Sequence, residues 1–244
     1  MTYVSARSRS YSGRQVAESY DATRFSSQAG KLLDLVERQI VSAFAPEDGK
    51  KRLVADIGTG TGRFAIGLIR SGFKVVASDA SLAMLLTGRR KLKASETNRA
   101  RFVLGDIYNL PLKQNSIAYV ICIHVLNQLG DIRDQVRAIG ELIRVCAPGG
   151  RIVFDAYSRK SMAAFAPGSK TGLVRLPDLE QQLARIETVR IHQVVGRFLI
   201  PITSFRILPV ALQRKLDYLD QLASARCPGL VTKAYYCLIK RERG

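Results

Sequence analysis

An acid followed by three alternating glycines is the part of this sequence best suited to chemistry. In the run DIGTGTG, Asp56 precedes Gly58, Gly60 and Gly62, and Thr59 separates the first two glycines. Glycine lets the backbone adopt positive φ and pass close to a ligand, and the start of a following helix offers unpaired N–H groups. The run therefore predicts a ligand-binding loop between a strand and a helix.

The residues around this loop separate the ligand classes that use such loops. A P-loop requires Gly-Lys-Ser/Thr, but Arg63 stands in place of the lysine. A dinucleotide loop reads G-x-G-x-x-G, which from Gly58 would require a glycine where Arg63 stands. S-adenosylmethionine carries an amino group and a sulfonium and no phosphate, so Asp56 can hold the loop and face its amino acid end. The pattern favours this methyl donor, and the alternative is a tight turn without a ligand.

Two further acids and a histidine follow at the ends of predicted strands. Asp79 lies where an acid grips ribose hydroxyls in dinucleotide folds, or it caps the next helix, which Ser81 could do equally well. Asp106 can accept from an adenine amino group. His124 ends the fourth predicted strand, where ligands bind in open α/β sheets; it is the candidate general base, or else a histidine that lines the pocket or the core.

The elements that must position these residues alternate between strand and helix. Apolar runs predict strands at 52–57, 74–78, 101–104, 117–123 and 151–154, and helical periodicity predicts helices at 63–70, 81–93 and 132–145. This alternation predicts a parallel sheet with right-handed crossovers. Segment 198–222 is mixed, with two prolines and many leucines, and no single element is predicted there.

Five stretches, all within residues 50–155, resemble those of a known family. They are VADIGTGTGRFA, VVASDASLAML, RFVLGDIYNLPL, SIAYVICIHVLNQL and RVCAPGGRIVF. The chain resembles class I S-adenosylmethionine-dependent methyltransferases, especially the type that includes ubiquinone/menaquinone biosynthesis methyltransferases. The resemblance implies a Rossmann-like, seven-stranded, mostly parallel α/β sheet with helices on both faces. Its last strand, at 232–240, would be antiparallel and pair near 187–195.

The resemblance also implies which residues contact S-adenosylmethionine. They are Asp56, Gly58, Gly60, Asp79, Asp106 and Ile107, with Ala80 and Met84 flanking the adenosine, the backbone near Ile123 approaching the methionine part, and Tyr20 as a lid residue. The chain departs from the family at Ala118, where an acid is frequent. It also has Asn127 and Gln128 where histidines are frequent, so no catalytic role is carried over to those positions.

A length of 244 residues fits a single methyltransferase domain. Residues 1–45 are expected to form a helical lid segment, 50–155 the cofactor-binding core, and 156–244 a C-terminal half with an acceptor-cap segment at 197–229. That cap segment interleaves apolar residues with Arg206, Arg214 and Lys215. It is interpreted as a lid over a lipophilic acceptor, as a patch on a membrane, or as a plain cover of the sheet.

The bulk composition points to an anionic partner without naming it. The net charge of +18 suggests RNA, an anionic membrane or a phosphorylated substrate, or else simple solubility. Four cysteines without a CxxC pair and two histidines argue against a zinc site and a disulfide framework, so no metal is expected. No apolar run is long enough to cross a bilayer and no secretory signal is seen, which favours the cytoplasm, with peripheral membrane contact as an option.

Three functions are therefore weighed for this chain. The first is methyl transfer to a small-molecule or lipid-like acceptor. The second is methylation of tRNA or rRNA, motivated by the positive charge. The third is an inactive cofactor-binding module that acts through interactions, against which the intact glycine loop and both acids argue.

Overall fold

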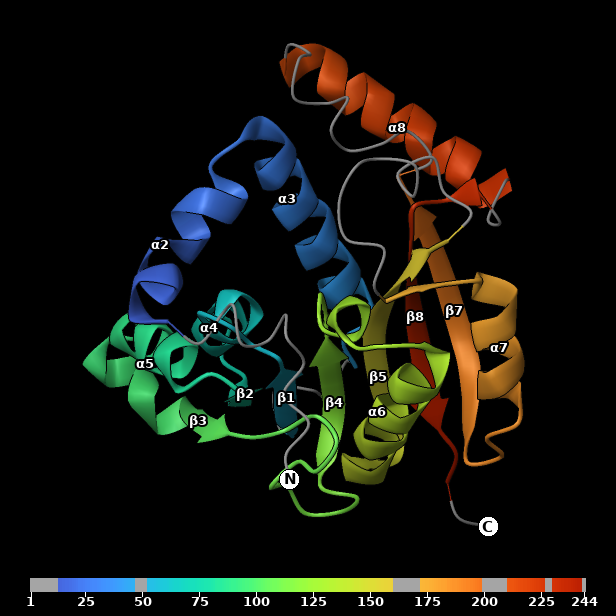
Figure 1. Ribbon diagram of the computed structural model, residues 1–244. Helices are drawn as coiled ribbons and strands as arrows, with labels where there is room; N and C mark the ends of the chain where they lie inside the picture. Colours follow the sequence, from blue (N-terminus) through green and yellow to red (C-terminus); the bar gives the residue numbers. More distant parts are fainter. Residues whose placement is uncertain (1–12, 47–51, 160–171, 199–209, 227–229, 243–244) are drawn as a thin grey trace.

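The computed structural model describes residues 13–46, 52–159, 172–198, 210–226 and 230–242. Within these residues eight strands form one sheet in the order β3-β2-β1-β4-β5-β8-β7, with β6 paired to β5 off this path (Figure 1). The strands are β1 Leu53–Ile57, β2 Lys74–Asp79, β3 Ala100–Leu104, β4 Ile117–Cys122, β5 Cys146–Ser158, β6 Leu173–Val174, β7 Val189–Arg197 and β8 Lys233–Lys240.

The strand directions confirm the expected topology. Strands β1 to β5 pair in parallel, and β8 lies between β5 and β7, antiparallel to both, with Leu238 opposite Ile152 and Ile191. The seven expected strands form the continuous path of the sheet, and the two-residue β6 adds an eighth beside Tyr157 and Ser158. A strand of two residues is too short to leave a periodic signal.

Helices cover both faces of the sheet. They are α2 Arg14–Phe25, α3 Gln28–Ala43, α4 Arg63–Arg70, α5 Leu82–Arg90, α6 Ile132–Val145, α7 Leu176–Ala184 and α8 Val210–Arg226. Helices α3 and α4 bury Ile40 and Ile69 against one face, and α6 and α7 bury Leu142 and Leu179 against the other. Strand β4 is buried at all six positions between these layers, which its continuous apolar composition requires.

Helix α8 was not predicted, because its pattern is the reverse of an ordinary amphipathic helix. Its fully buried residues are polar: Asp220 accepts a hydrogen bond from the Phe198 backbone N–H (2.9 Å), and Ser224 lies one turn further. Asp217 on the same side pairs with Arg197 (2.8 Å). Among the α8 side chains that the structure describes, no apolar one is fully buried, so hydrophobic periodicity gives little signal. Part of segment 198–222, at 199–209, lies outside the described residues.

The loops that carry chemistry leave the carboxyl ends of β1, β2, β3 and β4, which lie at one edge of the sheet. Figure 1 shows α2 and α3 rising beside this edge, next to α4 and α5. Ligands of open α/β sheets bind outside the carboxyl ends of the strands. Among the described helices, none has the length and apolar character needed to cross a membrane.

Candidate active site

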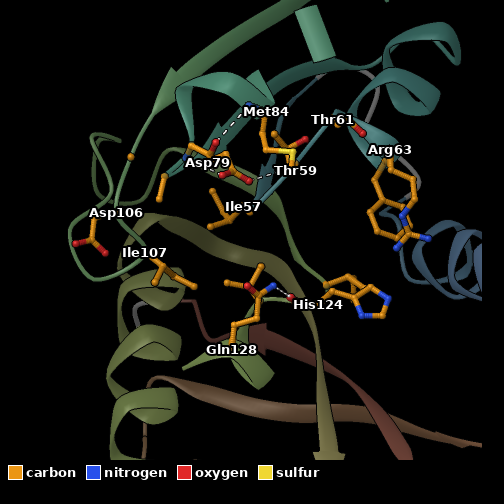
Figure 2. Close-up of a pocket in the computed structure, with 18 of the residues that line it drawn as sticks. Ile57, Thr59, Thr61, Arg63, Asp79, Met84, Asp106, Ile107, His124 and Gln128 are labelled. Atoms are coloured by element: carbon orange, nitrogen blue, oxygen red, sulfur yellow. Dashed lines mark hydrogen bonds between the residues drawn. The ribbon is translucent and has the colours of Figure 1, made fainter. Parts of the chain in front are cut away.

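A cavity of about 400 Å³ lies at the carboxyl edge of the sheet (Figure 2). Most of the residues singled out in the sequence line it: Tyr20, Gly58, Thr59, Gly60, Asp79, Ala80, Met84, Asp106, Ile107, Ile123 and His124. Asp106 and Ile107 lie at one end of the view, and Arg63 and His124 lie at the other. The volume falls within the range of small-molecule and cofactor pockets.

The glycine loop needs glycine for two different reasons. Gly58 and Gly60 both have left-handed backbones, with φ of 69° and 56°. A Cβ on Gly58 would lie 2.1 Å from the Val125 Cγ2 atom, whereas a Cβ on Gly60 would meet nothing within 4 Å. Gly58 thus permits close packing, while Gly60 presents bare backbone to the open cavity and forms a cradle that a Cβ would fill.

Asp56 lies beneath the loop and does not line the cavity. It is 1% exposed, and its Oδ2 accepts hydrogen bonds from the Thr59 hydroxyl (2.7 Å) and the Ala65 N–H (3.0 Å). Burial raises the pKa of Asp56 to about 6. Asp56 therefore holds the loop, as expected, but from below, without facing the ligand space. Gly62 also lies outside the cavity lining, as the left-handed N-cap of α4.

Asp79 joins the glycine loop to the start of α5. Its Oδ2 accepts from the Gly60 N–H (2.8 Å) and its Oδ1 accepts from the Ser81 N–H (2.8 Å). Ser81 is itself the N-cap of α5 and accepts from the Met84 N–H (3.3 Å). Burial raises the pKa of Asp79. Asp79 thus fixes the loop and still presents its carboxylate to the cavity, while Ser81 performs the capping.

Helix α2 is attached to the same loop through its acids. Asp21 accepts from the Thr61 hydroxyl (2.5 Å) and forms an ion pair with Lys91 at the end of α5. Glu18 pairs with Arg90 (3.4 Å). Two basic residues at the end of α5, Arg90 and Lys91, therefore hold α2, whose Tyr20 lines the cavity.

His124 is held in an uncommon conformation at the end of β4. Its φ is 65°, and its N–H donates to Asp155 Oδ1 (2.8 Å). The ring Nε2 lies 2.8 Å from Glu37 Oε1, and the ring Nδ1 lies 3.1 Å from the Tyr157 hydroxyl. Burial lowers the pKa of His124, outweighing the attraction of Glu37. Both ring nitrogens are thus already engaged within the protein.

Glu37 is the centre of a buried ionic cluster behind His124. It is fully buried and receives hydrogen bonds from Arg63 (2.6 Å), Lys233 (2.5 Å) and Tyr235 (3.0 Å). Burial alone would raise the pKa of Glu37, but the neighbouring His124, Lys233 and Arg63 groups hold it well below its ordinary value. Glu37 is therefore an ionised carboxylate inside the fold.

Lys233 balances two carboxylates in this cluster. Its ammonium lies 2.6 Å from Asp155 Oδ2 as well as beside Glu37. Burial would lower the pKa of Lys233, but Asp155 and Glu37 hold it well above its ordinary value. Ligand atoms of Glu37, His124 and Asp155 lie within 4.8 Å of one another, as in a metal site. In this structure the Lys233 ammonium supplies positive charge between the two carboxylates.

Sequence reasoning missed most of this cluster. Glu37 carried a signal, since it is an acid among the apolar residues of the expected helical segment 1–45, and Asp155 directly follows a predicted strand. Tyr157 and Lys233 carried no such signal in the sequence, because their partners come from distant segments of the chain. None of the described residues in the expected acceptor-cap segment, 197–198 and 210–226, lines the cavity.

Comparisons with known proteins agree with this geometry. Residues 54–150 match the family of methyltransferase domains. A demethylmenaquinone methyltransferase of Clavibacter sepedonicus is 34% identical over 145 residues, which cover 59% of this chain and 56% of that protein. The chain spans less than two thirds of the length of the first curated relatives it matches.

Solved structures share the fold at low identity. Geranyl diphosphate C-methyltransferase of Streptomyces coelicolor superposes with a TM-score of 0.60 at 15% identity, covering 86% of this chain and 80% of that one. Phosphoethanolamine N-methyltransferase 2 of Haemonchus contortus superposes with a TM-score of 0.65 at 16% identity, covering 96% and 59%. These likenesses show a shared fold. In sequence, residues 54–150 match methyltransferase domains, and the chain is similar to demethylmenaquinone methyltransferases.

Proposed function

We propose that this protein transfers a methyl group from S-adenosylmethionine to a small, lipid-like acceptor. The observation that carries the proposal is the cavity in which the open, left-handed backbone of Gly60 meets the carboxylate of Asp79. A bare backbone beside an acid suits a ligand with hydroxyl and amino groups and no phosphate. When bound, this cofactor supplies an electrophilic methyl group on its sulfonium.

The lining residues can hold that cofactor in a defined direction. Each Asp79 oxygen accepts one backbone N–H and keeps further acceptor capacity, which suits ribose hydroxyls. Asp106 and Ile107 lie at the far end of the cavity from His124 (Figure 2), which suits an adenine ring. Ala80 and Met84 would flank the adenosine, Gly58 and the backbone at Ile123 would face the methionine part, and Tyr20 would close over it.

The acceptor would enter at the end where His124 lies. The Arg63 guanidinium stacks there over the rings of Phe25 (4.7 Å) and Phe64 (4.0 Å), and both rings line the cavity. Aromatic walls suit a planar apolar acceptor. Relatives named demethylmenaquinone methyltransferase support a hydroxylated aromatic ring with an apolar tail.

The test is methyl transfer from labelled S-adenosylmethionine to demethylmenaquinol, with Asp79→Ala as the negative control. Label in the quinol supports the proposal. Bulk RNA is offered in parallel, because the charge of +18 motivates that alternative. Label in RNA alone would overturn the acceptor class, and bound cofactor without transfer to any fraction would indicate an inactive binding module.

We further propose that α8 brings the protein to an anionic membrane. Leu212, Lys215, Leu219, Leu222 and Arg226 are exposed and recur at intervals of three and four residues, which places them on one helix face. This outward face is apolar with a basic residue between and after its leucines, while the fully buried α8 side chains that the structure describes are those of Asp220 and Ser224. Such a face suits the boundary between headgroups and acyl chains of acidic lipids.

The prediction for this face is reduced binding to vesicles when its leucines become polar. Leu219→Gln with Leu222→Gln should weaken sedimentation with vesicles of phosphatidylglycerol and phosphatidylcholine by about ten-fold or more. Leu86→Gln, which alters an exposed leucine on α5, should leave binding unchanged. Equal binding by all three proteins would contradict the assignment, and binding lost for Leu86→Gln as well would point to a general effect of surface polarity.

A further inference from the structure

The backbone of His124 is strained and fixed from several sides. A left-handed conformation is unfavourable for a non-glycine residue, and such residues persist where the surroundings fix them, often at active sites. Here the N–H donates to Asp155 and the carbonyl accepts from the Gln128 side chain. The ring is held by Glu37 and Tyr157. These contacts fix the imidazole at the cavity wall.

The contacts also determine which ring nitrogen carries the hydrogen. Glu37 is ionised and can only accept, so the Nε2 that lies 2.8 Å from it must be the N–H. Burial keeps the imidazole neutral near neutral pH. Nδ1 then has the lone pair, and the Tyr157 hydroxyl at 3.1 Å donates to it. A base at His124 therefore acts through Nδ1, and a proton reaches that nitrogen through the Tyr157 hydroxyl bonded to it.

The exposure of Glu37, His124 and Tyr157 gives the direction in which a proton would move along them. Glu37 is fully buried and His124 is 9% exposed, whereas Tyr157 is half-buried at the carboxyl end of β5, beside the cavity wall that His124 forms and outside the lining itself. We propose that Tyr157, His124 and Glu37 form a proton relay in which Tyr157 contacts the acceptor and Glu37 is the inner, positioning residue. This inference rests on the proposed methyl transfer and names the residues that remove the acceptor's proton.

Methyl transfer is coupled to removal of a proton from the acceptor. The acceptor's nucleophilic atom forms its bond to the methyl carbon, and the carbon–sulfur bond breaks with its electron pair left on sulfur. The acceptor's proton passes to the Tyr157 oxygen while the phenol's own proton passes to His124 Nδ1. Glu37 stabilises the resulting imidazolium through Nε2–H, as the carboxylate does in a Ser-His-Asp triad. The proton then returns to solvent.

The charges facing His124 leave room for this transient cation. Glu37 on α3, Asp155 on β5 and Lys233 on β8 act on His124, and the Tyr157 hydroxyl contacts its Nδ1. Behind Glu37, Arg63 on α4 and Tyr235 on β8 donate to that carboxylate, and Arg63 also pairs with Asp34 (2.9 Å). The carboxylates of Glu37, Asp155 and Asp34 outnumber the cations of Arg63 and Lys233, which favours a transient imidazolium. Protonating His124 beforehand disables the relay, so transfer should fall on the acid side.

The first test measures the tautomer and the titration of His124 directly, without enzymatic turnover. The chain has two histidines, so His192→Gln leaves His124 as the only signal in a ¹⁵N-histidine NMR spectrum. The expected result is an Nε2–H tautomer at neutral pH that titrates below the ordinary histidine range. In this background Tyr157→Phe should shift the Nδ1 resonance, and Glu37→Gln should lower the histidine pKa further because an attracting charge is lost. An Nδ1–H tautomer, or no response to Tyr157→Phe, would overturn the relay.

The second test is the rate and pH profile of methyl transfer to demethylmenaquinol. Tyr157→Phe should lower kcat by about 100-fold and alter the acid limb, with affinity for S-adenosylhomocysteine unchanged by calorimetry. Tyr236→Phe is the matched control, since that hydroxyl binds Glu180 on the opposite face of the sheet. Full kcat with Tyr157→Phe refutes the relay. A wild-type protein that fails to methylate demethylmenaquinol refutes the proposed acceptor instead, while the NMR result still decides the relay.

Discussion

At the scale of single residues, Asp79 combines a structural and a ligand-facing role. It fastens Gly60 and Ser81 by their N–H groups and also lines the cavity. Asp56, one strand away, makes equally short hydrogen bonds but lies wholly beneath the loop. The two acids should therefore respond differently to substitution.

Replacing Asp79 should weaken cofactor binding more than it weakens the fold. Asp79→Ala removes the acceptors for two N–H groups and for a ribose, so the Kd for S-adenosylhomocysteine should rise at least about ten-fold by calorimetry, roughly 1.4 kcal/mol. Asp79→Asn keeps one carbonyl acceptor and should lie between Ala and wild type. Asp178→Ala, on the exposed start of α7, is the control. An unchanged Kd for Asp79→Ala would remove this acid from the site.

Asp56 should instead affect how stability depends on pH. Its pKa is raised to about 6 in the folded protein, above the value near 4 expected when unfolded, so the folded state holds this proton more tightly. The resulting stabilisation is full below about pH 4 and is lost as the pH rises through about 6. Asp56→Asn keeps an acceptor but cannot titrate.

The free energy of unfolding of Asp56→Asn relative to wild type should therefore increase between about pH 4.5 and about pH 7.5, by roughly 2 kcal/mol. Urea denaturation at both pH values measures this difference. A constant difference between the two proteins would mean that Asp56 titrates normally and is less isolated from solvent than its burial indicates.

At the scale of elements, the glycine loop and the helices around it form the walls of the cavity. Gly60 and Gly72 provide a matched pair for testing this wall. Both have left-handed backbones, and a Cβ on either would meet nothing within 4 Å. Gly60 lies between β1 and α4 and lines the cavity, whereas Gly72 follows α4 and does not line it.

Gly60→Ala and Gly72→Ala should therefore lose similar stability, about 1 kcal/mol each from the strained φ. Gly60→Ala alone should lose affinity for S-adenosylhomocysteine, because its methyl group occupies the cavity. Thermal unfolding and calorimetry separate these two effects. Equal affinities for the two variants would place the cofactor away from the loop.

At the scale of the whole molecule, the cavity joins elements that are far apart in the sequence. Helix α2 contributes Tyr20 and Phe25 and is tied to the loop and to α5 through Asp21. A ligand in this cavity should therefore stabilise the fold as a unit and order α2 in particular.

S-adenosylhomocysteine at about 100 times its Kd should stabilise the protein by roughly 2.7 kcal/mol. Hydrogen exchange should show added protection in α2, while α7, on the opposite face with its buried Leu179, should show only the global change. Asp79→Ala is the control in which both effects shrink at the same ligand concentration. Protection that spares α2 would contradict its role as a lid.

Local sequence signals were sufficient to predict most of the residues that line the cavity around the glycine loop. The glycine loop, Asp79, Asp106 and Ile107 each lie next to a strand end, and parallel strands bring their carboxyl ends together. Hydrophobic periodicity predicted α4 and α6 at their observed bounds. These features depend on residues close in the sequence, so the sequence alone determined the fold class and the cofactor loop.

The tertiary structure alone decided what surrounds His124. Glu37, Tyr157 and Lys233 come from α3, β5 and β8, and their meeting depends on the order of strands in the sheet and on the helix packed over it. The outward leucines of α8 were equally hidden, because its polar buried face exists only opposite Arg197 and Phe198. Local patterns cannot specify such contacts, since the free energy that fixes them arises only when distant charges are buried together.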